Sequence, residues 1–366
     1  MTEHTNGMDQ AYDASRLALA LDLLKSAVEI GEVPAAATAI ALHDRLLAHK
    51  AWGRPGWAIE EAPLAPDAPF IVASITKPVV CMGAMLLLDQ GVITLDDSVA
   101  RYVPAFAARG KQSITLRHLM THTSGLPDQL EQNIALRQQH AGLGHFVAAV
   151  CALEPLFEPG TRVSYQSMGL LMLGHLMEAV TGQPLRQFLR ENLFEPLGMI
   201  GTTLAMPDGG LATSARANDS PVDTQSSVES DWGWNSDYWR DLGAPWGGLH
   251  ATAGDLSRLL QHMLGARPGP LSPAARRAMV CDQIATMPRI SPEQRLTDRW
   301  GLGWRLGAAS QGDLASRDAF GHTGATGTLF WADPETGLSC VLLTNQPSIH
   351  RLFARYSNAI ASALRG

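Results

Sequence analysis

Strand-forming segments lie near both ends of this chain, and the long stretch between them reads as helix and loop. Two apolar runs, residues 36–42 and 46–52, are joined by the polar pair His43-Asp44 and predict a strand hairpin. Further short strands are predicted late in the chain, at residues 303–306, 319–322, 328–332 and 338–344. A sheet must therefore be assembled from both ends of the chain, with the middle inserted between its two halves.

Helical patterns flank these strands and fill the middle. Residues 14–30 carry Leu17, Leu21, Leu24 and Val28 at helical spacing, which predicts an amphipathic helix. The other predicted helices are at about 74–89, which ends at Gly91, and at 117–121, 146–153, 169–180, 185–194 and 351–364. The composition of residues 212–235, rich in Ser, Asp, Asn, Thr and Gln, is typical of a loop.

These patterns predict an α+β fold, with an antiparallel sheet flanked by helices and an inserted helical lobe. A chain of 366 residues with 46% apolar composition can bury one sizeable core. We therefore expect a single domain over residues 1–366. Its α/β body comprises about 14–105 plus 245–366, and the helical lobe comprises about 106–244.

The charge pattern argues against several classes of partner. The net charge is −7, and no Lys/Arg-rich stripe is present, so we expect neither nucleic acid nor membrane as a partner. Residues 1–14 lack the pattern of an export signal, and the apolar run at 82–88 is too short to span a bilayer. We expect a cytoplasmic protein. The oligomeric state is not readable from the sequence.

The four cysteines, Cys81, Cys151, Cys281 and Cys340, are far apart and form no C-x-x-C pair. This spacing predicts buried, reduced thiols rather than a disulfide or a metal site.

Residues 71–78, IVASITKP, are the most informative segment for chemistry. The chain has only four lysines among 28 basic residues, and Lys77 is retained inside this apolar stretch. Arg stays protonated in proteins, whereas a partly buried Lys can lose its proton near neutral pH. Pro78 is tolerated only near the start of a helix, so the helix begins at about Ser74 and brings the Lys77 amine beside the Ser74 hydroxyl. By itself the pair is equally consistent with an N-cap serine and a snorkelling lysine.

Two later segments contain residues that could act together with Ser74 and Lys77. Tyr165, in VSYQS, precedes a helix-patterned run, and a phenol near a lysine ammonium can have its pKa lowered and serve as a general base. The alternative is a half-buried tyrosine bonded to the backbone. The segment GHTGA at 321–325 lies on a predicted strand, where small residues let the backbone approach a ligand and supply an oxyanion donor.

The order S-x-x-K at 74–77, Y-x-(N/S) at 165–167 and (K/H)-T-G at 322–324 resembles the serine β-lactamase family. That family includes class C β-lactamases, penicillin-binding D,D-peptidases, D-aminopeptidases and family VIII esterases. The resemblance extends through residues 116–126, 192–199 and 247–256, and covers about residues 14–364.

The resemblance implies an acyl-enzyme mechanism and a residue for each role. Ser74 is the acylated nucleophile, and Lys77 and Tyr165 are the proton-shuttling pair. The backbone N–H groups of Ser74 and Ala325 form the oxyanion hole. Which of Lys77 and Tyr165 takes the first proton stays open, because the two titrate as a coupled pair.

Two positions depart from the β-lactamase pattern. Ser167 stands where β-lactamases carry Asn and offers one donor instead of a carboxamide, and His322 replaces the usual Lys and is largely neutral at pH 7. Ser167, His322 and Gly324 are candidate substrate-binding residues, and the small Gly324 lets the strand backbone approach a ligand closely. The Asn-to-Ser change at Ser167 and the Lys-to-His change at His322 both weaken the binding of carboxylated amides. They therefore favour a carboxylesterase acting on small esters.

The densest aromatic cluster lies just before Gly247 and comprises Trp232, Trp234, Tyr238, Trp239 and Trp246. Trp232, Trp234 and Trp239 are candidate substrate-binding residues that line an apolar pocket. The structural alternative, slightly favoured, is that these rings anchor a long loop onto the body.

Rival chemistries find little support. There is no G-x-S-x-G elbow and no phosphate-binding glycine motif, so no cofactor is indicated. His118 and His122 lie four apart on a predicted helix, but the Glu of H-E-x-x-H is missing, which favours packed or capping histidines over a metal site. A D-stereospecific peptidase or amidase, a weak β-lactamase, an acyltransferase and a non-catalytic binding module remain as alternatives.

Overall fold

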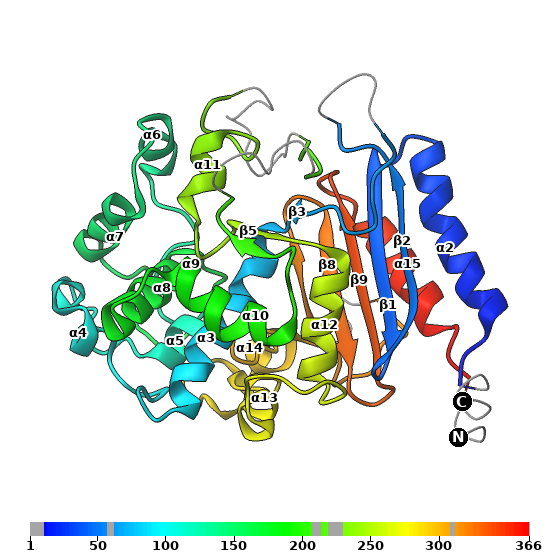
Figure 1. Cartoon of the computed structure of the whole chain (residues 1–366). Coiled ribbons are helices and arrows are strands. Elements are labelled where there is room, and N and C mark those ends of the chain that lie inside the picture. Colours follow the sequence, from blue (N-terminus) through cyan, green and yellow to red (C-terminus); the bar gives the residue numbers. More distant parts are fainter. Residues whose placement is uncertain (1–10, 57–61, 207–213, 219–229, 308–311, 366) are drawn as a thin grey trace.

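Figure 1 shows the computed structural model, in which helices cover both faces of one large sheet. The structure describes residues 11–56, 62–206, 214–218, 230–307 and 312–365. The large sheet has six antiparallel strands in the order β2-β1-β9-β8-β7-β6. Their bounds are β1 (Ala35–Leu42), β2 (Arg45–Gly53), β6 (Arg305–Leu306), β7 (Phe320–Gly324), β8 (Thr328–Asp333) and β9 (Leu338–Thr344).

The two halves of this sheet meet where β1 pairs with β9, with Ala37 opposite Leu343. The predicted assembly of the sheet from both ends of the chain is therefore confirmed, and so are the α+β class and the hairpin of β1 and β2.

The central strands are buried on both faces, which explains why their sequences are continuous apolar runs. Successive side chains of β9 alternate between two hydrophobic clusters: Cys340 and Leu342 face one, and Val341 and Leu343 face the other. The first cluster lies under α2 (Ala14–Glu29) and α15 (His350–Ala361), on the right of Figure 1. On the opposite face, α12 (Ala253–Met263) packs against β1 and β9.

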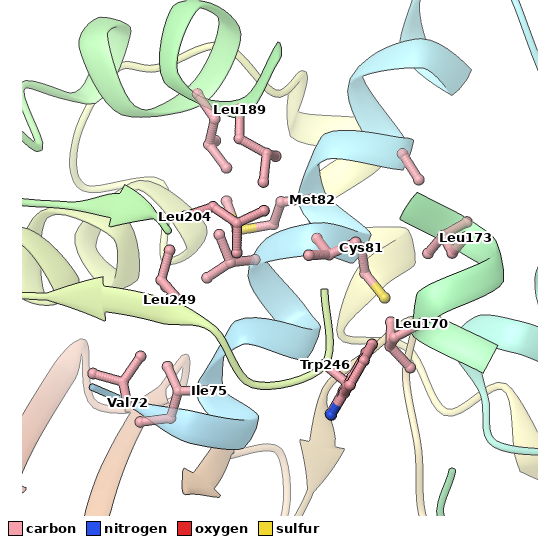
Figure 2. Packing of buried hydrophobic residues seen from close by; sticks show 14 of the residues in the cluster. Val72, Ile75, Cys81, Met82, Leu170, Leu173, Leu189, Leu204, Trp246 and Leu249 are labelled. Carbon is pink, nitrogen blue, oxygen red and sulfur yellow. The ribbon is translucent and has the colours of Figure 1, made fainter. Parts of the chain in front are cut away.

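The core beyond α12 is built around α3 (Thr76–Asp89), in which every residue from Thr76 to Leu87 is buried. Figure 2 shows Cys81 and Met82 of this helix among Leu170, Leu173 and Leu189 from the neighbouring helices. A helix that is apolar all round belongs in the interior of a large core. The remaining helices are α4 (Val99–Tyr102), α5 (Leu116–Met120), α6 (Asn133–Gln138), α7 (Leu143–Ala152), α8 (Met168–Thr181), α9 (Leu185–Leu189), α10 (Glu195–Leu197), α11 (Asp237–Leu242), α13 (Pro273–Met279) and α14 (Pro292–Thr297).

A second sheet of three short strands was not predicted. It comprises β3 (Phe70–Ile71), β5 (Leu249–Ala251) and β4 (Thr203–Leu204), in the order β3-β5-β4. Strands of two or three residues carry no readable alternation, so the sequence pattern missed them. Because β4 lies in the stretch predicted to be helix and loop, that prediction is wrong at this point. The division into a body and a helical lobe stays a prediction.

The structure bears on two further expectations, one on the burial of the cysteines and one on helices that could cross a membrane. Cys81 and Cys340 are buried, but Cys151 is half-buried and Cys281 is exposed, so the prediction of buried thiols is wrong for Cys281. Within the described residues, no helix combines the length and the hydropathy that crossing a membrane requires.

We predict that Leu24, the more deeply buried of the two buried leucines of α2, helps to hold this helix to the sheet. Leu24 is fully buried and Leu19, on the same helix, is 68% exposed. Leu24→Ala should lower the free energy of unfolding by about 2–5 kcal/mol, since it leaves a cavity, whereas Leu19→Ala should change it by less than about 0.5 kcal/mol. Urea unfolding of both variants measures the difference. Equal losses would contradict the observed packing of α2.

Candidate active site

Ser74 lies on a tight 3₁₀ turn, Ala73–Ile75, between β3 and the N-terminus of α3. The residue before it, Ala73, has a φ of 45°, which side-chain-bearing residues rarely adopt. Val72, on one side of this strained residue, is held by two hydrogen bonds. The Val72 N–H donates to the Leu249 carbonyl at 2.9 Å, and the Thr328 hydroxyl donates to the Val72 carbonyl at 3.0 Å. Strain of this kind persists only where the surroundings over-determine it, as here.

Thr76 fixes the turn from the other side. Its hydroxyl donates to the Ala73 carbonyl at 2.6 Å and accepts the Leu249 N–H at 3.0 Å. The side chain is fully buried. One hydroxyl therefore ties the strained turn both to the start of α3 and to the central strand of the small sheet.

The structure places the Lys77 amine beside Ser74, as the helical spacing predicted. The Lys77 Nζ lies 2.9 Å from the Ser74 Oγ and 3.1 Å from the Trp246 carbonyl oxygen. Lys77 is only 1% exposed. Burial lowers the pKa of its amine from the ordinary 10.5 to about 8, against an opposing effect of Asp128. Near physiological pH a minority of this amine, roughly a tenth to a fifth, is therefore neutral and able to accept a proton.

Tyr165 completes a group of three. It lies in the loop before α8, its phenol is a hydrogen-bonding neighbour of the Ser74 side chain, and the Lys77 Nζ lies 4.6 Å from the centre of its ring. Burial raises the pKa of the phenol, and the hydrogen bond with Ser74 and the charge of Arg305 offset only part of this rise. The expectation that the neighbouring lysine lowers this pKa is thus wrong. A phenol that keeps its proton is a hydrogen-bond donor.

Two backbone N–H groups are available to an oxyanion. Ser74 and Ala325 both line the same cavity, and within the described part of the chain neither N–H donates to another protein atom. Gly324 brings their two segments together. A Cβ on Gly324 would lie 2.2 Å from the Val72 carbonyl oxygen, so only glycine allows β7 to approach the turn this closely.

The cavity beside Ser74 has a volume of about 170 Å³. This is smaller than the usual range of ligand pockets, about 300–1,000 Å³, and suits a small ligand. Its wall comprises Ala73, Ser74, Asp128, Gln129, Asn133, Arg137, Tyr165, Ser167, Met168, Trp234, Trp239, Trp246, Gly247 and Ala325. Trp234 and Trp239, two of the predicted substrate-binding residues, are thus on this wall.

The structure places three other predicted binding residues away from the wall. Trp232 packs its ring under the Arg137 guanidinium, 5.0 Å away, and its carbonyl accepts hydrogen bonds from that group, so it anchors the loop. Gly324 lies against Val72. His322 is only 4% exposed, its ring centre lies 5.9 Å from that of Tyr165, and its Nδ1 pairs with the Thr323 carbonyl at 2.6 Å. Burial lowers the pKa of His322 to about 3, so the ring is neutral.

Ser167 is on the wall, but its hydroxyl is already bonded. The Ser167 Oγ donates to the Asp128 carboxylate at 2.5 Å. A hydroxyl has one donor, so Ser167 offers the cavity only lone pairs.

His118 and His122 are separated by the end of α5. The His118 Nδ1 accepts the Thr115 N–H in a capping box. His122 lies beyond the helix with a φ of 61°, accepts the Gln166 N–H, and packs against Tyr165 with ring centres 4.7 Å apart. Both are thus capping or packed histidines. In the described ranges, no group of three or more His, Cys, Asp or Glu residues is arranged to hold a metal ion.

Sequence reasoning missed several wall residues, chiefly Asp128, Asn133 and Arg137. Asp128 follows Pro127 in a loop, and Asn133 and Arg137 lie on the short α6. A loop carboxylate and a six-residue helix carry no periodic signal that points to a cavity. The only available clue was that Asp128 lies two residues after the segment 116–126 that carries the family resemblance.

Comparison with known proteins agrees with this geometry. Residues 22–365 match the Beta-lactamase family. An Escherichia coli (strain K12) protein named "Putative D-alanyl-D-alanine carboxypeptidase" is 29% identical, over 87% of this chain and 80% of that protein.

Two solved structures are similar in fold. One is described as "EstCE1, a hydrolase with promiscuous acyltransferase activity", with a TM-score of 0.79 and 21% identity over 95% of this chain and 98% of that one. The other is "a family VIII carboxylesterase", with a TM-score of 0.76 and 20% identity over 96% and 99%.

We predict that the Thr76 hydroxyl stabilises the turn that carries Ser74. Thr76→Val should lower the free energy of unfolding by about 1–3 kcal/mol, because the buried Leu249 N–H loses its acceptor. Thr76→Ser keeps the hydroxyl and serves as the control, with a smaller loss. The measurement is urea unfolding. A valine variant as stable as the serine variant would show that these bonds do not hold the turn.

Proposed function

Because the chain belongs to the Beta-lactamase family of serine hydrolases, we propose that it hydrolyses small carboxylic esters through an acyl-enzyme on Ser74. The observation that carries the proposal is the buried Lys77 amine, 2.9 Å from the Ser74 Oγ, with its pKa lowered to about 8. A serine hydroxyl is a weak nucleophile until a neighbouring base accepts its proton. Lys77 is such a base.

Acylation then follows from the positions of the groups. The Ser74 Oγ attacks the ester carbonyl while its proton passes to the neutral Lys77 amine, and a tetrahedral oxyanion forms. The N–H groups of Ser74 and Ala325 donate to this oxyanion. The ester C–O bond breaks, and the leaving alkoxide takes a proton from the Tyr165 phenol, which is resupplied from Lys77.

Deacylation repeats these steps with water. Water attacks the acyl carbonyl and gives a proton to the base, and the Ser74 Oγ leaves with a proton returned to it. The free carboxylic acid is the product. The order of proton acceptance, open from the sequence alone, is assigned here to Lys77 first, because burial lowers its pKa and raises that of Tyr165.

Esters are favoured over carboxylated amides by what the cavity wall offers. The Ser167 hydroxyl already donates its hydrogen bond to Asp128, and the His322 ring is neutral and buried. Neither residue is therefore placed to hold a substrate amide carbonyl or a carboxylate. The small cavity, about 170 Å³, favours short acyl groups.

A second candidate is a D-stereospecific peptidase. It is favoured by the Escherichia coli relative and its printed name. The same three side chains serve this reaction, since an amine leaving group needs a proton donor and Tyr165 keeps its proton.

We predict that Ser74 carries all hydrolytic turnover. Wild-type protein should hydrolyse p-nitrophenyl butyrate efficiently, and turn over nitrocefin and a D-Ala-D-Ala peptide weakly or not at all. Ser74→Ala should lose at least about a thousandfold in kcat/KM, as expected for loss of a nucleophile. Intact mass spectrometry after fluorophosphonate treatment should show one adduct on wild type and none on Ser74→Ala.

The control for this experiment is Ser26→Ala, which changes an exposed serine of α2 and should keep both turnover and labelling. Efficient turnover of the D-Ala-D-Ala peptide without ester hydrolysis would replace the esterase with the second candidate. Ester hydrolysis that survives Ser74→Ala would reject the acyl-enzyme on Ser74.

We also predict the pH profile. The neutral amine is the active form of Lys77, so kcat/KM for p-nitrophenyl butyrate should rise about tenfold per pH unit below about 8 and level off above it. Lys77→Arg should be inactive across the whole range, because the guanidinium stays protonated. A flat profile between pH 6 and pH 9 would argue against Lys77 as the base.

A further inference from the structure

Two charged side chains on the cavity wall, Asp128 and Arg137, have no part in the acylation steps. Asp128 lies in the loop between α5 and α6, its side chain is exposed, and it lines the same cavity as Ser74 and Tyr165. Its carboxylate accepts the Ser167 hydroxyl at 2.5 Å, which fixes it against the wall. A fixed carboxylate in a substrate cavity contributes a negative potential there.

The charge of Asp128 acts directly on the reacting groups. Its carboxylate raises the pKa of Lys77 and that of Tyr165, so its field extends to both side chains around Ser74. Both effects have the sign expected of a nearby negative charge.

The positive charge on the same wall lies against aromatic rings. Arg137 is 4% exposed, and its guanidinium lies 4.4 Å from the Trp239 ring centre and 5.0 Å from that of Trp232 and donates to the Trp232 carbonyl. Arg305 lowers the pKa of Tyr165 from the edge strand β6, where its guanidinium lies over the Trp300 ring. Among the described residues of this wall, Asp128 is the one acidic group.

We propose that Asp128 is a specificity-determining residue, which selects substrates carrying an ammonium group near the scissile ester and rejects those carrying a carboxylate. The inference rests on the proposed ester hydrolysis. Aromatic rings next to a carboxylate are the chemistry that recognises quaternary ammonium groups, and Trp234, Trp246 and Tyr165 provide such rings on this wall.

The expected size of the effect follows from Coulomb's law. Opposite unit charges several ångströms apart near a protein surface attract enough to change kcat/KM by roughly tenfold. Because Asp128 is exposed, dissolved salt should screen this attraction.

The test uses esters that differ only in charge. Three p-nitrophenyl esters carry γ-trimethylammoniobutyrate, its uncharged tert-butyl isostere, or the glutarate monoanion, and acetylcholine is paired with its tert-butyl isostere to place the charge on the alcohol. The readout is the ratio of kcat/KM for each charged ester to that of the neutral tert-butyl ester of the same series, p-nitrophenyl or acetyl. It is measured at alkaline pH, where Lys77 is neutral.

Wild type should favour the cationic ester over its neutral isostere in at least one pair. Asp128→Asn should lower this cation ratio by roughly tenfold, and should raise the ratio of the glutarate ester to the neutral ester by a similar factor. Asn keeps an oxygen acceptor for Ser167. Glu131→Gln, which removes an exposed charge three residues away and outside the cavity wall, should leave the ratios unchanged. In wild type, raising the ionic strength should lower the cation ratio, which tests the inference without any variant.

Equal ratios in wild type and Asp128→Asn, or ratios that do not respond to salt, would overturn the role of Asp128. Failure of the proposed function looks different: no neutral ester would then be turned over in a Ser74-dependent way.

Discussion

The proposed chemistry of this site depends on keeping a lysine amine buried away from water next to a serine hydroxyl. Holding the pKa of Lys77 near 8 instead of 10.5 means that the folded protein disfavours the protonated amine by about 3 kcal/mol. The fold imposes this cost because Lys77 lies on α3, which is buried along almost its whole length at the centre of the main core. The Ser74 hydroxyl and the Trp246 carbonyl are the polar partners that the amine retains.

The rest of the structure holds the serine where this amine can reach it. The Ser74 turn is clamped between the two sheets, by Thr328 of the large sheet on one side and by β5 of the small sheet on the other. Gly324 allows the C-terminal end of β7 to pack closely against the Ser74 turn. This packing brings the N–H of Ala325 to the same cavity. The strained φ of Ala73 is thus supported by two sheets and one helix, which positions the hydroxyl before any substrate binds.

Much of this arrangement could be predicted from the sequence, and the failures have physical reasons. The Ser74–Lys77 spacing fixed the pair, because geometry within one helical turn is local. The strands at both ends of the chain implied the large sheet, whereas β3, β4 and β5 were too short to leave a pattern. The pKa of Tyr165 was predicted in the wrong direction, because burial is a tertiary property and outweighs the nearby lysine. Asp128 was missed because its place on the cavity wall depends on tertiary contacts, such as the bond from Ser167, 39 residues away along the chain.

The most direct test is to titrate Lys77 itself. The chain has only four lysines, so side-chain NMR of protein labelled at the lysine Cε and Nζ gives few signals, and the loss of one signal in Lys77→Arg assigns it. The account predicts that the assigned signal titrates at about pH 8 in the folded protein. A Lys77 signal that stays protonated up to its ordinary range near pH 10 would contradict the central claim, because the amine would then not be available as a base.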